Sequence, residues 1–310
     1  MDNMKKKIIV VAGATASGKT ALGIAIAKAV NGEIISADSM QVYKGMPIAT
    51  AAPTREEQQA VPHHLVTFLD PSENFSVARW CDLARAKIDE ILSRNHIPII
   101  VGGTGLFIDS LADNIIFEEI PVDNALRQRL MEKSEDDLYN ELLSLDPKAA
   151  EDIHKNNKKR VVRALELYYT GSSKTQQNIN SRKTQSPYEV LYFFINYRDR
   201  QKLYDRINKR VDMMLDLGII DEARDCMDKY TGTSAQAIGH KELMPYLKGA
   251  DSLENCVNKL KQETRRYAKR QITWFKRREN AVLLEPDVSG NDGMVNCAVK
   301  KCEEFLNGRV

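Results

Sequence analysis

Apolar residues in the first third of the chain form short continuous runs that alternate with longer amphipathic stretches. The runs 7–12, 33–37 and 97–101 have the length of buried strands, whereas the stretches 21–30 and 76–94 follow a helical period. Strands that are apolar on both faces and alternate with helices indicate a parallel sheet that helices cover on both sides. We therefore predict an α/β fold.

The pattern changes between residues 118 and 187, where polar and charged residues dominate and the apolar positions recur at helical spacing. Those positions are Leu126 and Leu130, after a helix start at Pro121–Asp123, and Val161, Val162, Leu165, Tyr168 and Tyr169. Residues 170–186 are rich in Ser, Thr, Asn and Gln and predict a loop. Residues 190–195 again resemble a buried strand, and the last third predicts helices until near the end. We therefore expect an α/β core of residues 1–117 and 188–310, interrupted by a helical insertion of residues 118–187.

Residues 13–20 contain the clearest motif in the chain. They match the phosphate-binding loop G-x-x-x-x-G-K-[ST] and lie between a strand-like and a helix-like segment: Gly13, Ala14, Thr15, Ala16, Ser17, Gly18, Lys19 and Thr20. The backbone N–H groups of residues 15–20 and the helix start would face an anion. Lys19 adds a positive charge, and the Thr20 hydroxyl is a ligand for Mg²⁺. The core is thus predicted to be a P-loop fold that binds a diphosphate or a triphosphate.

Polar residues also follow two other predicted strands. Asp38 and Ser39 follow the strand 33–37, and Gly102–Thr104 follows the strand 97–101. Ligands of parallel sheets bind at these strand ends, so the three segments should meet in one crevice. Asp38 fits two roles at this stage, a proton acceptor or orienting group for a substrate, and a helix cap. No Walker-B Asp follows residue 101, and both a diphosphate substrate and a small-molecule kinase remain open.

Two stretches of the chain are basic without any acidic residue. Residues 155–163 hold five Lys or Arg and residues 265–278 hold seven. Helical spacing places Arg160 and Arg163, and likewise Arg266 and Arg270, opposite the apolar positions of their helices. Solvated helix faces usually mix charges of both signs, so two such stretches favour a polyanionic partner.

Arg206 and Arg210 lie four residues apart on a further predicted helix. They could pair with Asp205 or Asp212 on the helix surface, or form a guanidinium fork for phosphate oxygens. The spacing by itself favours surface pairing.

The composition is typical of a globular protein and limits the remaining classes. The chain has 310 residues, 43% hydrophobic and 28% charged, with a net charge of +2, so a nucleic-acid surface would be local. Its five cysteines are scattered and predict neither disulfides nor a zinc site. No signal-peptide pattern or apolar run of about 18 residues is present, so we expect a cytoplasmic protein that does not bind membranes.

The motifs together resemble the tRNA dimethylallyltransferases, also called isopentenyl-tRNA transferases. The matching stretches are residues 13–20, 35–46, 100–107, 160–166 and 267–275, in the same order and at similar spacing. Two positions depart from the family pattern. Ala14 replaces a common Pro, and His240 lies where the family more often has Tyr, which would weaken stacking by this ring.

The resemblance implies a reaction and a set of roles. Dimethylallyl diphosphate would donate its prenyl group to N6 of the adenosine 3′ of the anticodon, in tRNAs that read codons starting with U. Lys19, Arg210 and Mg²⁺ at Thr20 would bind the diphosphate, and Asp38 would accept the N6 proton. The anticodon stem-loop would contact Asp38, Ser39, Met40, Gln41, Thr104, Arg127, Lys159, Arg160, Val161, Val162, Arg163, Arg266 and Arg270. We expect a monomer; a P-loop small-molecule kinase and a binding-only RNA protein are the alternatives.

Overall fold

The computed structural model describes residues 5–115, 117, 123–175, 185–227 and 232–308. It divides into two compact units, which we call the core unit, Met1–Ala112 with Pro187–Val310, and the helical unit, Asp113–Ser186. The sequence had predicted an insertion at residues 118–187, and the helical unit begins five residues earlier and ends one residue earlier. No helix among the described residues is long and apolar enough to cross a membrane.

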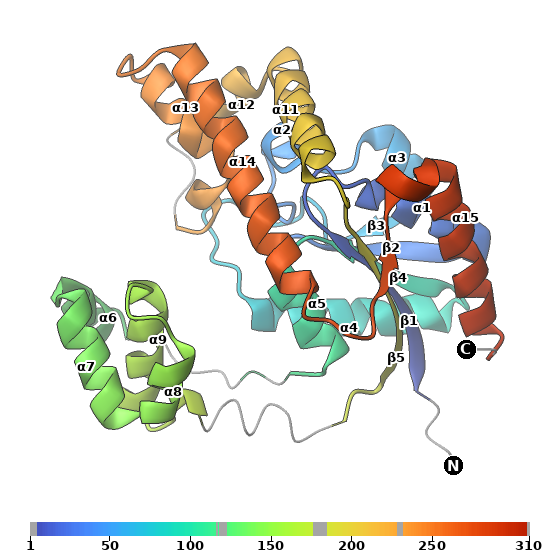
Figure 1. Cartoon of the computed structure of the whole chain (residues 1–310). Coiled ribbons are helices and arrows are strands. Elements are labelled where there is room, and N and C mark those ends of the chain that lie inside the picture. Colours follow the sequence, from blue (N-terminus) through green and yellow to red (C-terminus); the bar gives the residue numbers. More distant parts are fainter. Residues whose placement is uncertain (1–4, 116, 118–122, 176–184, 228–231, 309–310) are drawn as a thin grey trace. The chain divides into compact units, whose positions relative to one another are not determined.

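The core unit is built around a parallel sheet, whose described strands have the order β3-β2-β4-β1-β5-β6 (Figure 1). The strands are β1 (Lys6–Gly13), β2 (Gly32–Ala37), β3 (His63–His64), β4 (Ile97–Gly102), β5 (Tyr188–Ile195) and β6 (Val282–Leu284). Ile9 on β1 lies opposite Ile99 on β4 and Leu191 on β5. The predicted α/β fold is confirmed. The sequence missed β3 and β6, because strands of two and three residues give no periodic signal.

Helices cover both faces of this sheet, which explains the continuous apolar runs. Helices α1 (Lys19–Val30) and α15 (Pro286–Leu306) share one face, where Ile9, Leu22 and Phe305 belong to the same buried cluster. Helices α4 (Val77–Ser93) and α5 (Gly105–Ala112) lie on the other face (Figure 1). There the Trp80 ring stacks on Phe107 at 4.9 Å between centroids, and its N–H donates to the Ser36 carbonyl at 3.0 Å. This bond secures the end of β2, two residues before Asp38.

A second group of helices in the core unit packs into a separate apolar cluster. It comprises α11 (Arg200–Asp216), α12 (Ile219–Cys226), α13 (His240–Leu247) and α14 (Leu253–Phe275). Val211, Leu243 and Leu260 are buried in this cluster, and Ile48 and Ala49 of the short helix α2 (Pro47–Thr50) pack against it. Helix α3 (Arg55–Ala60) follows and begins with a capping box at Thr54. The cluster therefore joins α2 to helices that are far from it in sequence.

The helical unit has its own core. It contains α6 (Asn124–Glu132), α7 (Glu135–Leu145), α8 (Pro147–Asp152) and α9 (Lys158–Tyr169), whose N-caps are Asp123, Ser134, Asp146 and Asn157. Leu126, Leu130, Val161, Val162 and Leu165 are buried as their spacing predicts, but Tyr168 and Tyr169 are exposed. Of the predicted helix start and loop, Pro121, Val122 and residues 176–184 lie outside the described residues.

Candidate active site

The phosphate-binding loop joins β1 to α1 and requires special backbone geometry. Ala16 and Gly18 adopt positive φ angles of 61° and 100°, which turn the chain into the first turn of α1. The amides of that turn have no acceptor within the helix, as at every helix start. A Cβ on Gly13 would lie 2.9 Å from the carbonyl oxygen of Ile195, so glycine lets the loop pass close to β5. The motif thus forms the anion-binding turn that its sequence predicts.

Two amides of the loop are already used inside the protein. The Thr15 N–H donates to Oε1 of Gln271 at 2.8 Å, and the Ser17 N–H donates to the Ala14 carbonyl at 3.2 Å. The binding of an anion by the amides of residues 15–20 stays a prediction, and these two amides would have to exchange their present acceptors for it. Gln271 is buried and also donates to the Gly103 carbonyl at 2.9 Å, where a Cβ on Gly103 would lie 2.1 Å from its Nε2. Gln271 therefore joins the loop to the segment after β4.

Lys19 and Arg210 are half-buried cations beside the loop. Lys19 Nζ donates to the Ala14 carbonyl at 2.7 Å, and Arg210 Nη1 donates to Thr15 Oγ1 at 3.3 Å. Burial, and secondarily the positive charge of Arg210, lower the pKa of Lys19 to about 8, although Asp38 opposes this shift. Burial also lowers the pKa of Arg210, against the attraction of Asp38 and Glu57. Two cations that lie beside the same loop, with no ion pair to a carboxylate among the contacts of the described residues, are suited to an anionic ligand.

The surface-pairing hypothesis for Arg206 and Arg210 is wrong among the described residues. Arg206 Nε donates to the Ala16 carbonyl at 2.9 Å, so both guanidinium groups contact the phosphate-binding loop. Asp205 accepts a hydrogen bond from Gln201, and Asp212 pairs with Lys261. Helical spacing could not show this, because the loop that the arginines contact is about 190 residues away in the chain.

Asp38 follows β2 and closes a turn with its own side chain. Its Oδ1 accepts hydrogen bonds from the Met40 N–H at 2.9 Å and the Gln41 N–H at 3.3 Å. This is the bonding of a cap, but no helix begins there; α2 starts only at Pro47. The helix-cap alternative is therefore wrong, and Oδ2 is the carboxylate oxygen not engaged in these two bonds.

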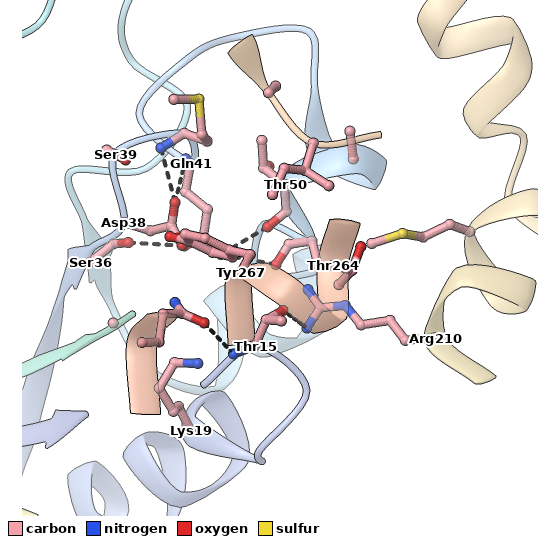
Figure 2. Close-up of a pocket in the computed structure, with 18 of the residues that line it drawn as sticks. Thr15, Lys19, Ser36, Asp38, Ser39, Gln41, Thr50, Arg210, Thr264 and Tyr267 are labelled. Atoms are coloured by element: carbon pink, nitrogen blue, oxygen red, sulfur yellow. Dashed lines mark hydrogen bonds between the residues drawn. The ribbon is translucent and has the colours of Figure 1, made fainter. Parts of the chain in front are cut away.

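One cavity of about 400 Å³ in the core unit brings these groups together (Figure 2). Its polar lining includes Thr15, Lys19, Thr20, Ser36, Asp38, Ser39, Gln41, Arg210, Thr264, Tyr267 and Gln271. Its apolar lining includes Ile34, Ala49, Val101, Val211, Met214, Ile238 and Leu260. Figure 2 shows Lys19 and Arg210 beside Thr15, with Asp38 and Gln41 on another part of the wall. Cations, a carboxylate and apolar surface therefore face one cavity.

The wall near Asp38 is fixed by further hydrogen bonds. The Ser39 N–H donates to Thr104 Oγ1 at 3.0 Å, and the Ser36 hydroxyl donates to Gln41 Oε1 at 2.9 Å. Burial and the negative charge of Asp38 raise the pKa of the Tyr267 phenol, which keeps it a neutral donor. Sequence analysis assigned no individual role to Tyr267, Thr264 or Gln271. The block 267–275 contains Tyr267 and Gln271, but no sequence signal pointed to Thr264.

The predicted basic residues differ in exposure and pairing. In the helical unit Lys159 and Arg160 are exposed, whereas Arg127 and Arg163 both bind Glu166, at 2.5 Å and 3.1 Å. In the core unit Arg266 pairs with Glu263 at 2.7 Å, and Arg270 lies over the Tyr267 ring at 5.6 Å. Glu166 and Glu263 lie two or three residues outside the acid-free stretches 155–163 and 265–278. The side chains of Val161 and Val162 are buried, so their assignment to a tRNA-contacting surface is wrong at the level of side chains.

Two further predictions concern a magnesium ion at Thr20 and the imidazole ring of His240. Thr20 lines the cavity, and no group of three or more His, Cys, Asp or Glu that could hold a metal occurs among the described residues. His240 is buried, and its Nε2 lies 2.8 Å from Oε1 of Glu222. It does not line the cavity, so the structure gives this ring no stacking role there, in line with the weakened stacking that the sequence predicted.

Comparison with known proteins gives consistent matches over nearly the whole chain. A model of the IPP transferase family matches residues 41–278, and one of isopentenyl transferases matches residues 6–67. The tRNA dimethylallyltransferase of Acetivibrio thermocellus is 48% identical, over 99% of this chain and 98% of that protein. The enzyme of the same name from Bacillus subtilis is 44% identical, over 89% and 90%.

Solved structures agree with these matches. The tRNA delta(2)-isopentenylpyrophosphate transferase of Staphylococcus epidermidis has a TM-score of 0.71 and 39% identity, covering 97% of this chain and 100% of that one. A eukaryotic dimethylallyltransferase acting on tRNA has a TM-score of 0.84 and 33% identity, covering 98% and 80%. The chain therefore belongs to the IPP transferase family, whose curated relatives are tRNA dimethylallyltransferases.

Proposed function

We propose that this protein transfers the dimethylallyl group from dimethylallyl diphosphate to N6 of the adenosine 3′ of the anticodon, in tRNAs that read codons starting with U. One observation carries the proposal: Lys19 and Arg210, beside the phosphate-binding loop, line the same cavity as the carboxylate of Asp38. A diphosphate leaving group needs the cations and an amine needs the proton acceptor. Family membership argues against the kinase alternative, and a protein that only binds RNA would have no use for this buried anion site.

In the proposed reaction the donor diphosphate lies against the start of α1. The bond between C1 of the prenyl group and the diphosphate oxygen breaks, and its electron pair leaves with the diphosphate. Lys19 and Arg210 stabilise the negative charge that develops on that oxygen, in a buried site where such charges interact strongly. The apolar lining gives the five-carbon group a dry surface. Release of diphosphate supplies the driving force, so ATP is not required.

The acceptor amine reacts from the side of Asp38. The N6 lone pair forms the new bond to C1, and the N6 proton passes to the Asp38 carboxylate. Its Oδ1 is held by two backbone amides, which fixes the orientation of the group before substrate binds. The adenine must leave its stack to enter the cavity, as bases do in other enzymes that modify them.

The residues of the cavity also fit a magnesium ion. Mg²⁺ keeps several waters and commonly binds through one or two protein oxygens together with substrate phosphates. Thr20 offers such a hydroxyl in the lining of the cavity, and a bound diphosphate would supply the other oxygens. When bound, the ion would neutralise charge on the diphosphate, in addition to Lys19 and Arg210.

The tRNA would be held mainly through its phosphates. Exposed cations on both units, Lys159 and Arg160 on one and Arg266 and Arg270 on the other, supply sequence-independent attraction. Ser39, Gln41 and Thr104 are near Asp38 and would contact the anticodon loop, where unstacked bases are accessible. We propose that the protein acts as a monomer.

A direct assay tests this proposal. The purified protein is incubated with Mg²⁺, dimethylallyl diphosphate and unmodified tRNA, and nucleosides from the digested tRNA are analysed by mass spectrometry. A prenylated adenosine next to the anticodon, formed without ATP, is the expected result. Asp38→Asn is the matched control, since it keeps the shape of the side chain. Product that depends on ATP, or no product with any tRNA that has an adenosine at this position, would contradict the proposal.

A further inference from the structure

Glu222 on α12 is a buried carboxylate that the proposed chemistry does not use. Its oxygens accept hydrogen bonds from the Ile48 N–H at 2.7 Å and the Ala49 N–H at 2.9 Å. The same carboxylate pairs with His240 Nε2 at 2.8 Å, and both side chains are about 90% buried, with exposed fractions of 8% and 10%. Neither residue lines the cavity. Glu222 therefore caps the first turn of α2 from a helix more than 170 residues away.

Helix α2 is in turn part of the cavity wall. Ala49, Thr50 and Ala51 line the cavity, and the carbonyls of Thr50 and Ala51 accept hydrogen bonds from Gln41 Nε2 at 3.2 Å and 3.0 Å. Figure 2 shows the Gln41 side chain between Thr50 and Ser36. The backbone N–H of Gln41 donates to Asp38. A continuous set of hydrogen bonds therefore runs from Glu222 through α2 and Gln41 to the catalytic carboxylate.

The donor side of the cavity has different supports. Thr15 is held by Gln271 and Arg210, and Lys19 is held by the Ala14 carbonyl. None of these contacts involves α2. A loosened α2 should consequently disturb the acceptor side and leave the binding of diphosphate unchanged.

We propose that the Glu222–His240 pair is a positioning device for the tRNA acceptor, which fixes α2 so that Gln41 and Asp38 are in place for the adenosine. This inference rests on the proposed function for its kinetic consequence, but the anchoring of α2 is a property of the protein alone. The start of α13 packs closely against α2 as well, since a Cβ on Gly239 would lie 3.1 Å from that of Ala49.

The pair also predicts which substitutions residue 240 accepts. A phenol can donate a hydrogen bond to a carboxylate as an imidazole N–H does. A phenyl ring has the shape but no donor. His240→Tyr should therefore preserve the function of the pair, whereas His240→Phe should lose it.

The test compares Glu222→Gln, His240→Phe and His240→Tyr with Asp221→Asn as the matched control. Asp221 precedes Glu222 on α12, but it is exposed and pairs only with Arg224 among the interactions that the structure describes. Two quantities are measured: hydrogen–deuterium exchange of the amides of Ile48 and Ala49, and kcat/KM for tRNA alongside KM for dimethylallyl diphosphate. Thermal unfolding identifies any variant that fails to fold.

In Glu222→Gln and His240→Phe we expect faster exchange at these amides and a loss of about 10–100-fold in kcat/KM for tRNA, with KM for the donor changed less than about twofold. His240→Tyr and Asp221→Asn should behave like the wild type. Unchanged exchange, or an equal loss for tRNA and donor, would overturn the inference. If the wild type shows no prenylation, the proposed function fails while the exchange data still report on the anchor.

Discussion

The cations of the phosphate-binding loop and those of the exposed helix surfaces are the same residue types in different physical states. Lys19 and Arg210 are half-buried, form no ion pair with a carboxylate of the described residues and have lowered pKa values. Arg266 and Arg270 are exposed, one paired with Glu263 and the other lying over the ring of Tyr267. Exposed charges are screened by salt and water, whereas partly buried charges are screened much less. Lys19 and Arg210 can therefore act on the chemistry, whereas Arg266 and Arg270 serve to attract and orient a large partner, with Arg270 also lining the cavity.

The largest effect should come from the carboxylate opposite Lys19 and Arg210. Asp38→Asn keeps an oxygen for the Met40 and Gln41 amides and so preserves the turn, but it cannot take a proton. Turnover should fall by about 10²–10⁴-fold while the affinity for the donor holds. Single-turnover kinetics and donor binding by calorimetry measure both. Near-normal turnover in Asp38→Asn would reduce Asp38 to an orienting residue, and lost donor affinity in Asp38→Ala would make it part of a metal site.

Removal of the Lys19 side chain should lower turnover without changing the affinity for RNA. Lys19→Ala removes a positive charge that faces the leaving group, so turnover should fall by about 10²–10³-fold. Binding of the anticodon stem-loop, measured by fluorescence anisotropy without donor, should stay within about twofold, since this affinity comes from other phosphate contacts. A Lys19→Ala variant that loses RNA affinity but retains turnover at saturating tRNA would contradict the division between cations that act on the leaving group and cations that bind RNA.

The two sets should also respond differently to pH. Lys19 has a pKa of about 8, so it loses its proton as pH rises through 8 and binds the diphosphate more weakly there. The donor dissociation constant should rise by up to about tenfold per pH unit above this value, because binding then requires uptake of a proton. Asp38→Asn should move this inflection to lower pH, since the carboxylate raises the pKa of Lys19. RNA binding should show no such inflection between pH 7 and 9, and a shared inflection would argue against separate roles.

The smallest expected effect concerns the exposed set. Arg266→Ala with Arg270→Ala should weaken tRNA binding and lower the slope of log affinity against log salt concentration by about 0.7–0.9 for each lost phosphate contact. Lys300→Ala with Lys301→Ala is the control, because these two lysines lie on α15, and no residue of this helix lines the cavity. A slope equal to that of the wild type would mean that Arg266 and Arg270 serve only their contacts with Glu263 and Tyr267.

The sequence by itself determined the α/β class, the position of the phosphate-binding turn and the family. These follow from local signals, since the apolar runs, the helical period and the motif at residues 13–20 each lie within a few neighbouring residues. The same signals predicted the buried positions Val161, Val162 and Leu165 of the helical unit.

Only the tertiary structure decided which residues meet. Gln271 uses the Thr15 amide, Arg210 contacts the loop, and Glu222 anchors α2, each across more than 170 residues of chain. The pairs Arg163–Glu166 and Arg266–Glu263 differ from these contacts, because their members lie three residues apart on the same helix and helical spacing alone brings them together. Periodicity reports which face of an element is buried, but not what lies against that face. The contacts that shape this site are between elements, and so they are fixed by packing and not by local sequence.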